Sequence, residues 1–140
     1  MDQADAIPLS LTADAKRFGS TVERSAQIGV GRVGGLARVA LTDSDRQMRD
    51  EFCAWCRAAD LSVTVDTVGN IFARRAGRDN ALPPVVLGSH LDTQINGGRY
   101  DGIVGVSPAM CGTTTQPRQT RCALSSWPRW SIARSARIAK

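Results

Sequence analysis

The segment that decides the fold of this 140-residue chain reads Val85-Val86-Leu87-Gly88-Ser89-His90-Leu91-Asp92-Thr93. Its first four residues form a short apolar run after two prolines, which is typical of a strand buried on both faces of a sheet. Helical and hairpin patterns precede this strand along the chain. Together they indicate an α/β fold, and the length suits one domain.

Two stretches ahead of this strand have apolar residues at helical spacing. The first covers residues 12–27, with Thr12 placed to cap its start. The second covers residues 45–59, where Ser44 and Gln47 have the spacing of a capping box. We therefore predict two amphipathic helices.

The segments that flank the second predicted helix have the composition of turns and strands. Residues 29–35 hold four glycines, but no apolar strand precedes them and no Lys-Ser or Lys-Thr follows. We therefore expect a flexible connection there rather than a phosphate-binding loop. Val63, Val65 and Thr67 alternate with polar neighbours, Gly69-Asn70 supplies a turn, and residues 71–73 resume an extended pattern, which predicts a hairpin.

Three side chains near the apolar strand have the chemistry of a metal site. His90 is the only histidine of the chain, and it lies with Asp92 just beyond the strand, where open α/β sheets bind ligands. An imidazole there can bind a metal through one nitrogen, while a carboxylate two residues later accepts the other N–H. Asp101 supplies a second carboxylate on a loop whose glycines allow close approach. A lone histidine with two nearby acids is, however, more often a satisfied polar group than a ligand.

The whole string around these residues resembles a known family. Val-Leu-Gly-Ser-His-Leu-Asp-Thr and Gly-Gly-Arg-Tyr-Asp-Gly, with Gly34-Gly35 and Val68-Gly69-Asn70, resemble the zinc-dependent amidase/hydantoinase/carbamoylase family over about residues 34–106. This family includes N-carbamoyl-L-amino-acid hydrolases, allantoate amidohydrolases and β-ureidopropionases. Ile103 stands where related dipeptidases carry a lysine, which favours the carbamoylase branch.

The resemblance implies a fold, a chemistry and a set of roles. The fold would be the N-terminal portion of an aminoacylase/carboxypeptidase-like metallohydrolase catalytic domain, incomplete here. His90 would bind one of two Zn²⁺ (or Mn²⁺ or Co²⁺) ions, Asp101 would bridge them, and Asp92 would be the catalytic residue that orients the histidine. The substrate would be a small carbamoyl or ureido compound, whose C–N bond is hydrolysed. The family is homodimeric, but its dimerisation domain has no counterpart in these residues.

The sequence departs from the family pattern after Asp101. The family places a Glu-Glu pair and two more histidine ligands downstream, whereas this chain has no glutamate after Glu51 and no second histidine. We therefore expect a truncated copy with little or no activity of its own.

A change of composition predicts a boundary near residue 106. Residues 1–110 hold 12 of the 18 Lys and Arg residues and all 13 Asp and Glu residues, so the basic pI belongs to the tail. We expect a partial catalytic domain over 1–106 and an irregular basic tail over 107–140, where Ser107-Pro108 would interrupt the family's helix. One explanation is a shifted reading frame. Ala133-Arg134-Ser135 can be encoded GCG-AGG-AGC, which contains GAG-GAG, two glutamate codons, in another frame. The other explanation is a genuine divergent tail.

Other functions remain open from sequence. The tail combines Trp127 and Trp130 with six basic residues, a composition compatible with a nucleic-acid or protein interaction module. Because the body of the chain has no basic bias, the sequence gives nucleic acid little support as a partner. A third possibility is a poorly folded fragment with neither function.

Two further features bear on metal and location. Cys53 and Cys56 lie within the second predicted helix, so free thiols are expected rather than a four-cysteine zinc site.

No apolar run is long enough for a membrane span, and Asp2 and Asp5 do not suit a secretory signal. We expect a cytoplasmic protein without a membrane partner.

Overall fold

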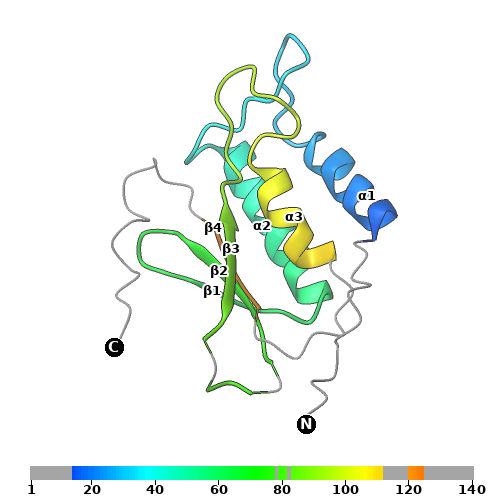
Figure 1. The fold of residues 1–140 in the computed structure, drawn as a ribbon. Helices are drawn as coiled ribbons and strands as arrows, with labels where there is room; N and C mark the ends of the chain where they lie inside the picture. The colour runs from blue at the N-terminus through cyan, green and yellow to red at the C-terminus, as the bar shows by residue number, and fades with distance from the viewer. Residues whose placement is uncertain (1–13, 78, 82, 112–119, 125–140) are drawn as a thin grey trace.

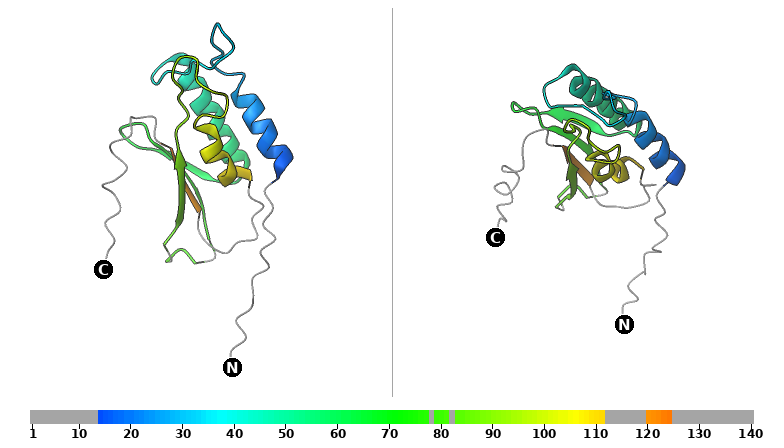
Figure 2. Two further views of the ribbon diagram at one scale, coloured as in Figure 1. Left: turned by 45° about the horizontal axis from the view of Figure 1, so that its top comes forward. Right: turned by 90° about the horizontal axis from the view of Figure 1, so that it is seen from above.

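A computed structural model describes residues 14–77, 79–81, 83–111 and 120–124. Within these residues, three helices lie on one side of a four-stranded sheet (Figures 1 and 2). In chain order the elements are α1 (Ala15–Ser25), α2 (Asp43–Ala58), β1 (Ser62–Val65), β2 (Ile71–Arg75), β3 (Val85–Ser89), α3 (Ile103–Cys111) and β4 (Thr120–Leu124). This mixture of helix and sheet confirms the predicted α/β class.

Both predicted helices form, but each begins at a different cap from the one the sequence suggested. Asp14 caps α1 by accepting a hydrogen bond from the amide of Arg17, and Thr12 lies outside the described residues. Thr42 caps α2 by accepting from the amide of Asp45, so the predicted Ser44 box is wrong. Both caps place a side-chain oxygen at an amide that has no intrahelical partner.

The predicted hairpin is the β1–β2 pair, whose strands are antiparallel. Its turn is closed by Asp66, whose carboxylate accepts hydrogen bonds from the amides of Val68 and Asn70 and from the Asn70 side chain. These contacts lower the pKa of Asp66, chiefly through the side-chain hydrogen bond from Asn70. The turn residues therefore fix the register of the two strands.

β3 is an edge strand, and this corrects the prediction that it is buried on both faces. The strand order is β1-β2-β4-β3, with β3 parallel to β4. Val85, Val86 and Leu87 are 46%, 57% and 38% exposed. At the end of the strand, Gly105 of α3 lies against Ser89. The apolar side chains of β3 are therefore only partly covered by the described residues.

The segment after residue 106 is more regular than predicted in two places. α3 continues through Ser107 and Pro108 to Cys111, because Ile103 and Val106 are fully buried and hold it against the rest of the domain. β4 then pairs with β2 on one side and β3 on the other. A five-residue strand held by backbone pairing leaves little trace in the hydrophobic period, which explains the error. The remainder of the tail lies outside the described residues, so the boundary at residue 106 stays a prediction.

The core forms where α2 and α3 cover the sheet. Met48, Phe52 and Cys56 of α2 are fully buried, and Ile71 and Ala73 of β2 are each 1% exposed. Cys53 and Cys56 form no disulfide, in agreement with the expectation of thiols, and burial raises the pKa of the Cys53 thiol. None of the described helices has the length and apolar character of a membrane span.

Candidate metal centre

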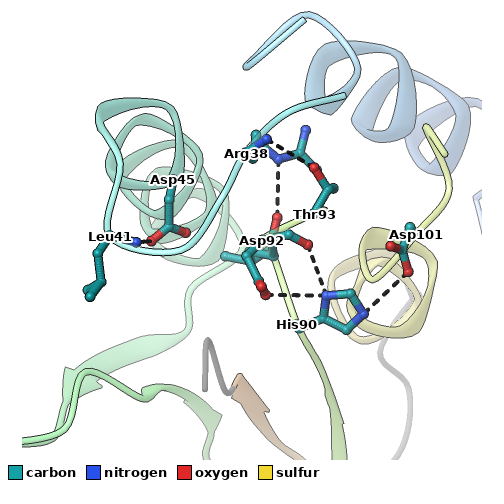
Figure 3. Close-up of polar contacts among 8 residues, drawn as sticks. Arg38, Leu41, Asp45, His90, Asp92, Thr93 and Asp101 are labelled. Atoms are coloured by element: carbon teal, nitrogen blue, oxygen red, sulfur yellow. Dashed lines mark hydrogen bonds and ion pairs between the residues drawn. The ribbon is translucent and has the colours of Figure 1, made fainter. Parts of the chain in front are cut away.

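The three side chains singled out in the sequence lie together beyond the end of β3. His90 follows Ser89, the last residue of the strand, and Asp92 lies two residues later on the same loop. Asp101 comes from the loop that leads into α3, and Figure 3 shows it on the opposite side of the His90 ring from Asp92. All three side chains are partly exposed, at 42% for His90, 29% for Asp92 and 42% for Asp101.

The two nitrogens of His90 face different partners. Nδ1 lies 2.9 Å from the carbonyl oxygen of Asp92 and 3.3 Å from its Oδ1. Nε2 lies 3.4 Å from Oδ1 of Asp101 (Figure 3). The tautomer with hydrogen on Nδ1 donates to Asp92 and leaves the lone pair of Nε2 directed towards Asp101. This is the arrangement in which an imidazole binds a metal while a second residue fixes its orientation.

The distance between Nε2 and the Asp101 oxygen fits a shared ion. Two atoms bound about 2.0 to 2.2 Å from one tetrahedral zinc ion lie roughly 3.4 Å apart. The observed separation between His90 Nε2 and Asp101 Oδ1 is 3.4 Å. The chemistry of the pair, one imidazole and one carboxylate, also suits Zn²⁺, Mn²⁺ or Co²⁺. The described residues add no third ligand at this point, so they form one edge of a site.

Gly102 allows the Asp101 loop to approach the histidine. Its φ angle of +71° lies in the left-handed region, and a β-carbon here would stand 2.8 Å from His90 Nδ1 and 2.9 Å from Cε1. The expected close approach of a glycine-flanked loop is therefore observed at this residue. Asp101 itself is fixed by its amide, which donates to the carbonyl of Gly98.

The glycine-rich segment 29–35 is paired rather than free, which corrects the expectation of a flexible connection. Leu36 and Gly97 exchange two backbone hydrogen bonds of 2.9 Å, and the amide of Ala37 donates to the carbonyl of Gly29. The segment therefore lies against the loop that follows Asp92. The lack of a phosphate-loop pattern in the sequence gave no sign of this pairing.

Two buried residues behind the site escaped the sequence analysis. Arg38 is 0% exposed, and Thr93 is 3% exposed. The amide of Arg38 donates to Oγ1 of Thr93 at 3.0 Å. A single arginine gives no direct sign that it will be buried, even between the apolar residues Ala37 and Val39, since arginine is normally exposed.

Known proteins that are similar to this chain include hydrolases. No family model matches the chain. An N-carbamoyl-L-amino-acid amidohydrolase of Rhizobium meliloti is 45% identical over 93 residues, which cover 66% of this chain and 22% of the relative. A protein of Mycolicibacterium smegmatis, named only as a hydrolase, is 40% identical over 128 residues, covering 91% of this chain and 28% of the relative. A match of that length reaches beyond residue 106, so the resemblance to relatives is not confined to residues 1–106.

A solved structure agrees with these relatives. The hydantoinase/carbamoylase family amidase of Burkholderia ambifaria superposes with a TM-score of 0.75 at 43% identity, covering 81% of this chain and 30% of that structure. The chain thus spans less than a third of the length of the proteins it matches. Over the matched segment it is a relative of the hydantoinase/carbamoylase amidases, and it carries part of their catalytic fold.

Proposed function

We propose that His90 and Asp101 form one edge of the divalent-metal centre of an amidohydrolase that cleaves C–N bonds other than peptide bonds. The observation that supports this most directly is the 3.4 Å separation between His90 Nε2 and Asp101 Oδ1, with Asp92 against the other ring nitrogen. The substrate class would be a linear ureido compound such as an N-carbamoyl-L-amino acid. The activity in the name of the Rhizobium relative supports this choice.

The residues of this chain would bind the metal and orient its ligands, and they would not transfer protons. When bound, a pair of Zn²⁺ ions (or Mn²⁺ or Co²⁺) would polarise the ureido carbonyl and lower the pKa of a water molecule. His90 and Asp101 would ligate, and Asp92 would keep the His90 ring in its Nδ1–H tautomer. Hydrolysis of an N-carbamoyl amino acid consumes water and yields the amino acid, carbon dioxide and ammonia.

The residues present do not complete this chemistry. Attack on a ureido carbon needs a general base, and proton transfer by a positioned carboxylate contributes about 10²- to 10⁴-fold to such reactions. The sequence has no glutamate after Glu51 and no second histidine that could close the metal site. We therefore propose that the 140-residue chain by itself is an inactive copy of such a hydrolase.

The origin of residues 107–140 can be tested from the coding DNA. We keep residues 1–106 and 107–140 as two proposed units, with a shifted reading frame or a divergent tail as the competing explanations of the second. The coding DNA from codon 105 onward, read in three frames, would separate them. A frame that encodes a Glu-Glu pair near codon 133 supports the shift, and its absence supports a genuine tail. The interaction function proposed for Trp127 and Trp130 rests on composition alone, because both residues lie outside the described part of the chain.

Metal binding and turnover can be tested in one set of proteins. Zinc titration by calorimetry should show binding by the 140-residue chain and its loss in His90→Ala and Asp101→Ala. Asp43→Ala is the matched control, because its carboxylate is 97% exposed at the start of α2. Ammonia release from N-carbamoyl-L-amino acids should be absent for the 140-residue chain. Robust turnover by that chain, or zinc binding that survives both site substitutions, would contradict the proposal.

A further inference from the structure

Arg38 is a fully buried guanidinium behind the metal site. It is the largest side chain in the described core with no exposed surface, and it lies between residues 29–35 and α2. Its Nη1 donates to the carbonyl oxygen of Ser25, the last residue of α1, at 2.7 Å and to that of Ile28, three residues beyond, at 3.1 Å. Its Nε donates at 3.1 Å to the carbonyl of Leu91. One charged group therefore ties the end of α1 to the loop that carries His90 and Asp92.

The backbone of Arg38 holds the same loop at a second point. Its amide donates to Oγ1 of Thr93 at 3.0 Å, and its carbonyl accepts from the amide of Thr93 at 2.8 Å. Leu91 and Thr93 are the two neighbours of Asp92, so Arg38 holds the chain on both sides of that residue. Figure 3 shows the contact between Arg38 and Thr93. Asp92 in turn presents its carbonyl and its carboxylate to His90 Nδ1.

The glycine-rich segment makes room for this side chain. Gly29 has a φ angle of +73°, and a β-carbon there would overlap the Arg38 stem, standing 3.4 Å from Cδ and closer still to Cγ. Any larger residue at this position would displace the arginine. One glycine of the unexplained 29–35 cluster thus has a structural purpose connected with the site.

The burial of the Arg38 guanidinium costs folding stability, so stability alone does not explain it. Burial is the main influence on the Arg38 pKa and lowers it, whereas Asp45, Asp92 and Asp101 oppose that shift. Its Nη2 has no hydrogen-bond acceptor among the described residues. A buried donor left without a partner costs stability, and an apolar side chain often replaces a buried charge without loss. The contacts to both neighbours of Asp92 give the arginine another purpose.

We propose that Arg38 is a positioning residue for the His90–Asp92–Asp101 site. By fixing Leu91 and Thr93 it keeps Asp92 against Nδ1 of His90, so that Nε2 stays directed towards Asp101. The inference rests on the proposed function for its metal, but the orientation of the His90 ring is a property of the metal-free chain. Arg38 itself touches neither His90 nor Asp101 through a hydrogen bond.

The test compares the zinc affinity of Arg38→Lys with that of a control variant at matched unfolding free energy. Lysine keeps the charge but lacks the planar fork that reaches α1 and Leu91 together. Phe52→Leu on α2 serves as the control, because it weakens the core but removes none of the hydrogen bonds that Arg38 makes. At concentrations of urea that equalise their unfolding free energies, zinc affinity should fall about 10- to 100-fold in Arg38→Lys relative to the control. Equal zinc affinity in the two variants would overturn the proposal.

A metal-free readout separates this proposal from the proposed function. Long-range ¹H–¹⁵N spectra should show the Nδ1–H tautomer of His90 in the wild type and a mixture of tautomers in Arg38→Lys. If the wild-type chain binds no zinc but the tautomer changes, the proposed function fails and Arg38 still positions His90. An unchanged tautomer contradicts the positioning role. If Arg38→Lys does not fold, Thr93→Val is the milder variant, since it removes only the hydroxyl that accepts from the Arg38 amide, and the same two outcomes decide.

Discussion

Gly102 lies so close to His90 that a β-carbon at residue 102 would stand 2.8 Å from Nδ1 of the histidine ring. Its φ angle of +71° is also one that L-residues adopt at a cost of about 1–2 kcal/mol. Gly102→Ala should therefore destabilise the fold by at least that amount and displace His90 from Asp101. Urea unfolding and zinc calorimetry measure the two effects.

Gly98 offers a matched control on the same loop. Its φ lies outside the left-handed region, and a β-carbon there would have nothing within 4 Å. Gly98→Ala should leave the unfolding free energy and the zinc affinity close to those of the wild type. Equal behaviour of the two alanine variants would mean that contact with His90 does not determine the role of Gly102.

The buried face of α2 predicts a large difference between two phenylalanines. Phe52 is 0% exposed in the core, whereas Phe72 of β2 is 37% exposed. Phe52→Ala should lower the unfolding free energy by about 3–5 kcal/mol, since it removes a large side chain and leaves a cavity. Phe72→Ala should cost clearly less. Urea unfolding followed by far-ultraviolet circular dichroism gives both values, and similar losses would contradict the assignment of the core.

The ion pair between α1 and α2 predicts a stability difference that depends on pH. Glu51 accepts hydrogen bonds from Nε and Nη2 of Arg24 at 3.0 and 3.2 Å, and the hydrogen bond from Arg24 lowers the pKa of Glu51. Because the pKa is lower in the folded state, the contribution is present above the ordinary value of 4.5 and is lost as the pH falls through the folded value. Glu51→Gln should therefore be less stable than the wild type at pH 7 and equal to it in strong acid.

Glu23→Gln on the exposed surface of α1 controls for the change in net charge. It should not reproduce the loss at pH 7. The effect of Glu51→Gln itself should be small, because both partners of the pair are substantially solvated. A difference that persists below the acidic transition would show that the pair acts through packing rather than through charge.

Local patterns in the sequence predicted the features that depend on neighbouring residues. The helical spacing of α2, the turn at Asn70 and the position of His90 beyond a strand each depend on residues that are close in sequence. The glycine at position 102 likewise indicated a close approach, and the structure has one. Such signals survive because they come from backbone geometry and side-chain period.

Features that depend on distant residues could not be predicted in the same way. β3 looks like a central strand, yet its position at the sheet edge depends on where β4 pairs. Arg38 looks like a surface residue, but its burial depends on carbonyl groups of Ser25, Ile28 and Leu91 that converge only in the fold. Neither property has a local pattern in the sequence, and both affect the surroundings of the candidate site.

The identity of the metal ligands can be measured directly by zinc X-ray absorption on the 140-residue chain with one equivalent of Zn²⁺. His90 and Asp101 as ligands predict a first shell of nitrogen and oxygen at about 2.0 to 2.2 Å, with the multiple scattering of one imidazole that disappears in His90→Ala. A shell of sulfur at about 2.3 Å, unchanged by His90→Ala, would assign the metal to the cysteines and contradict the metal centre proposed between His90 and Asp101.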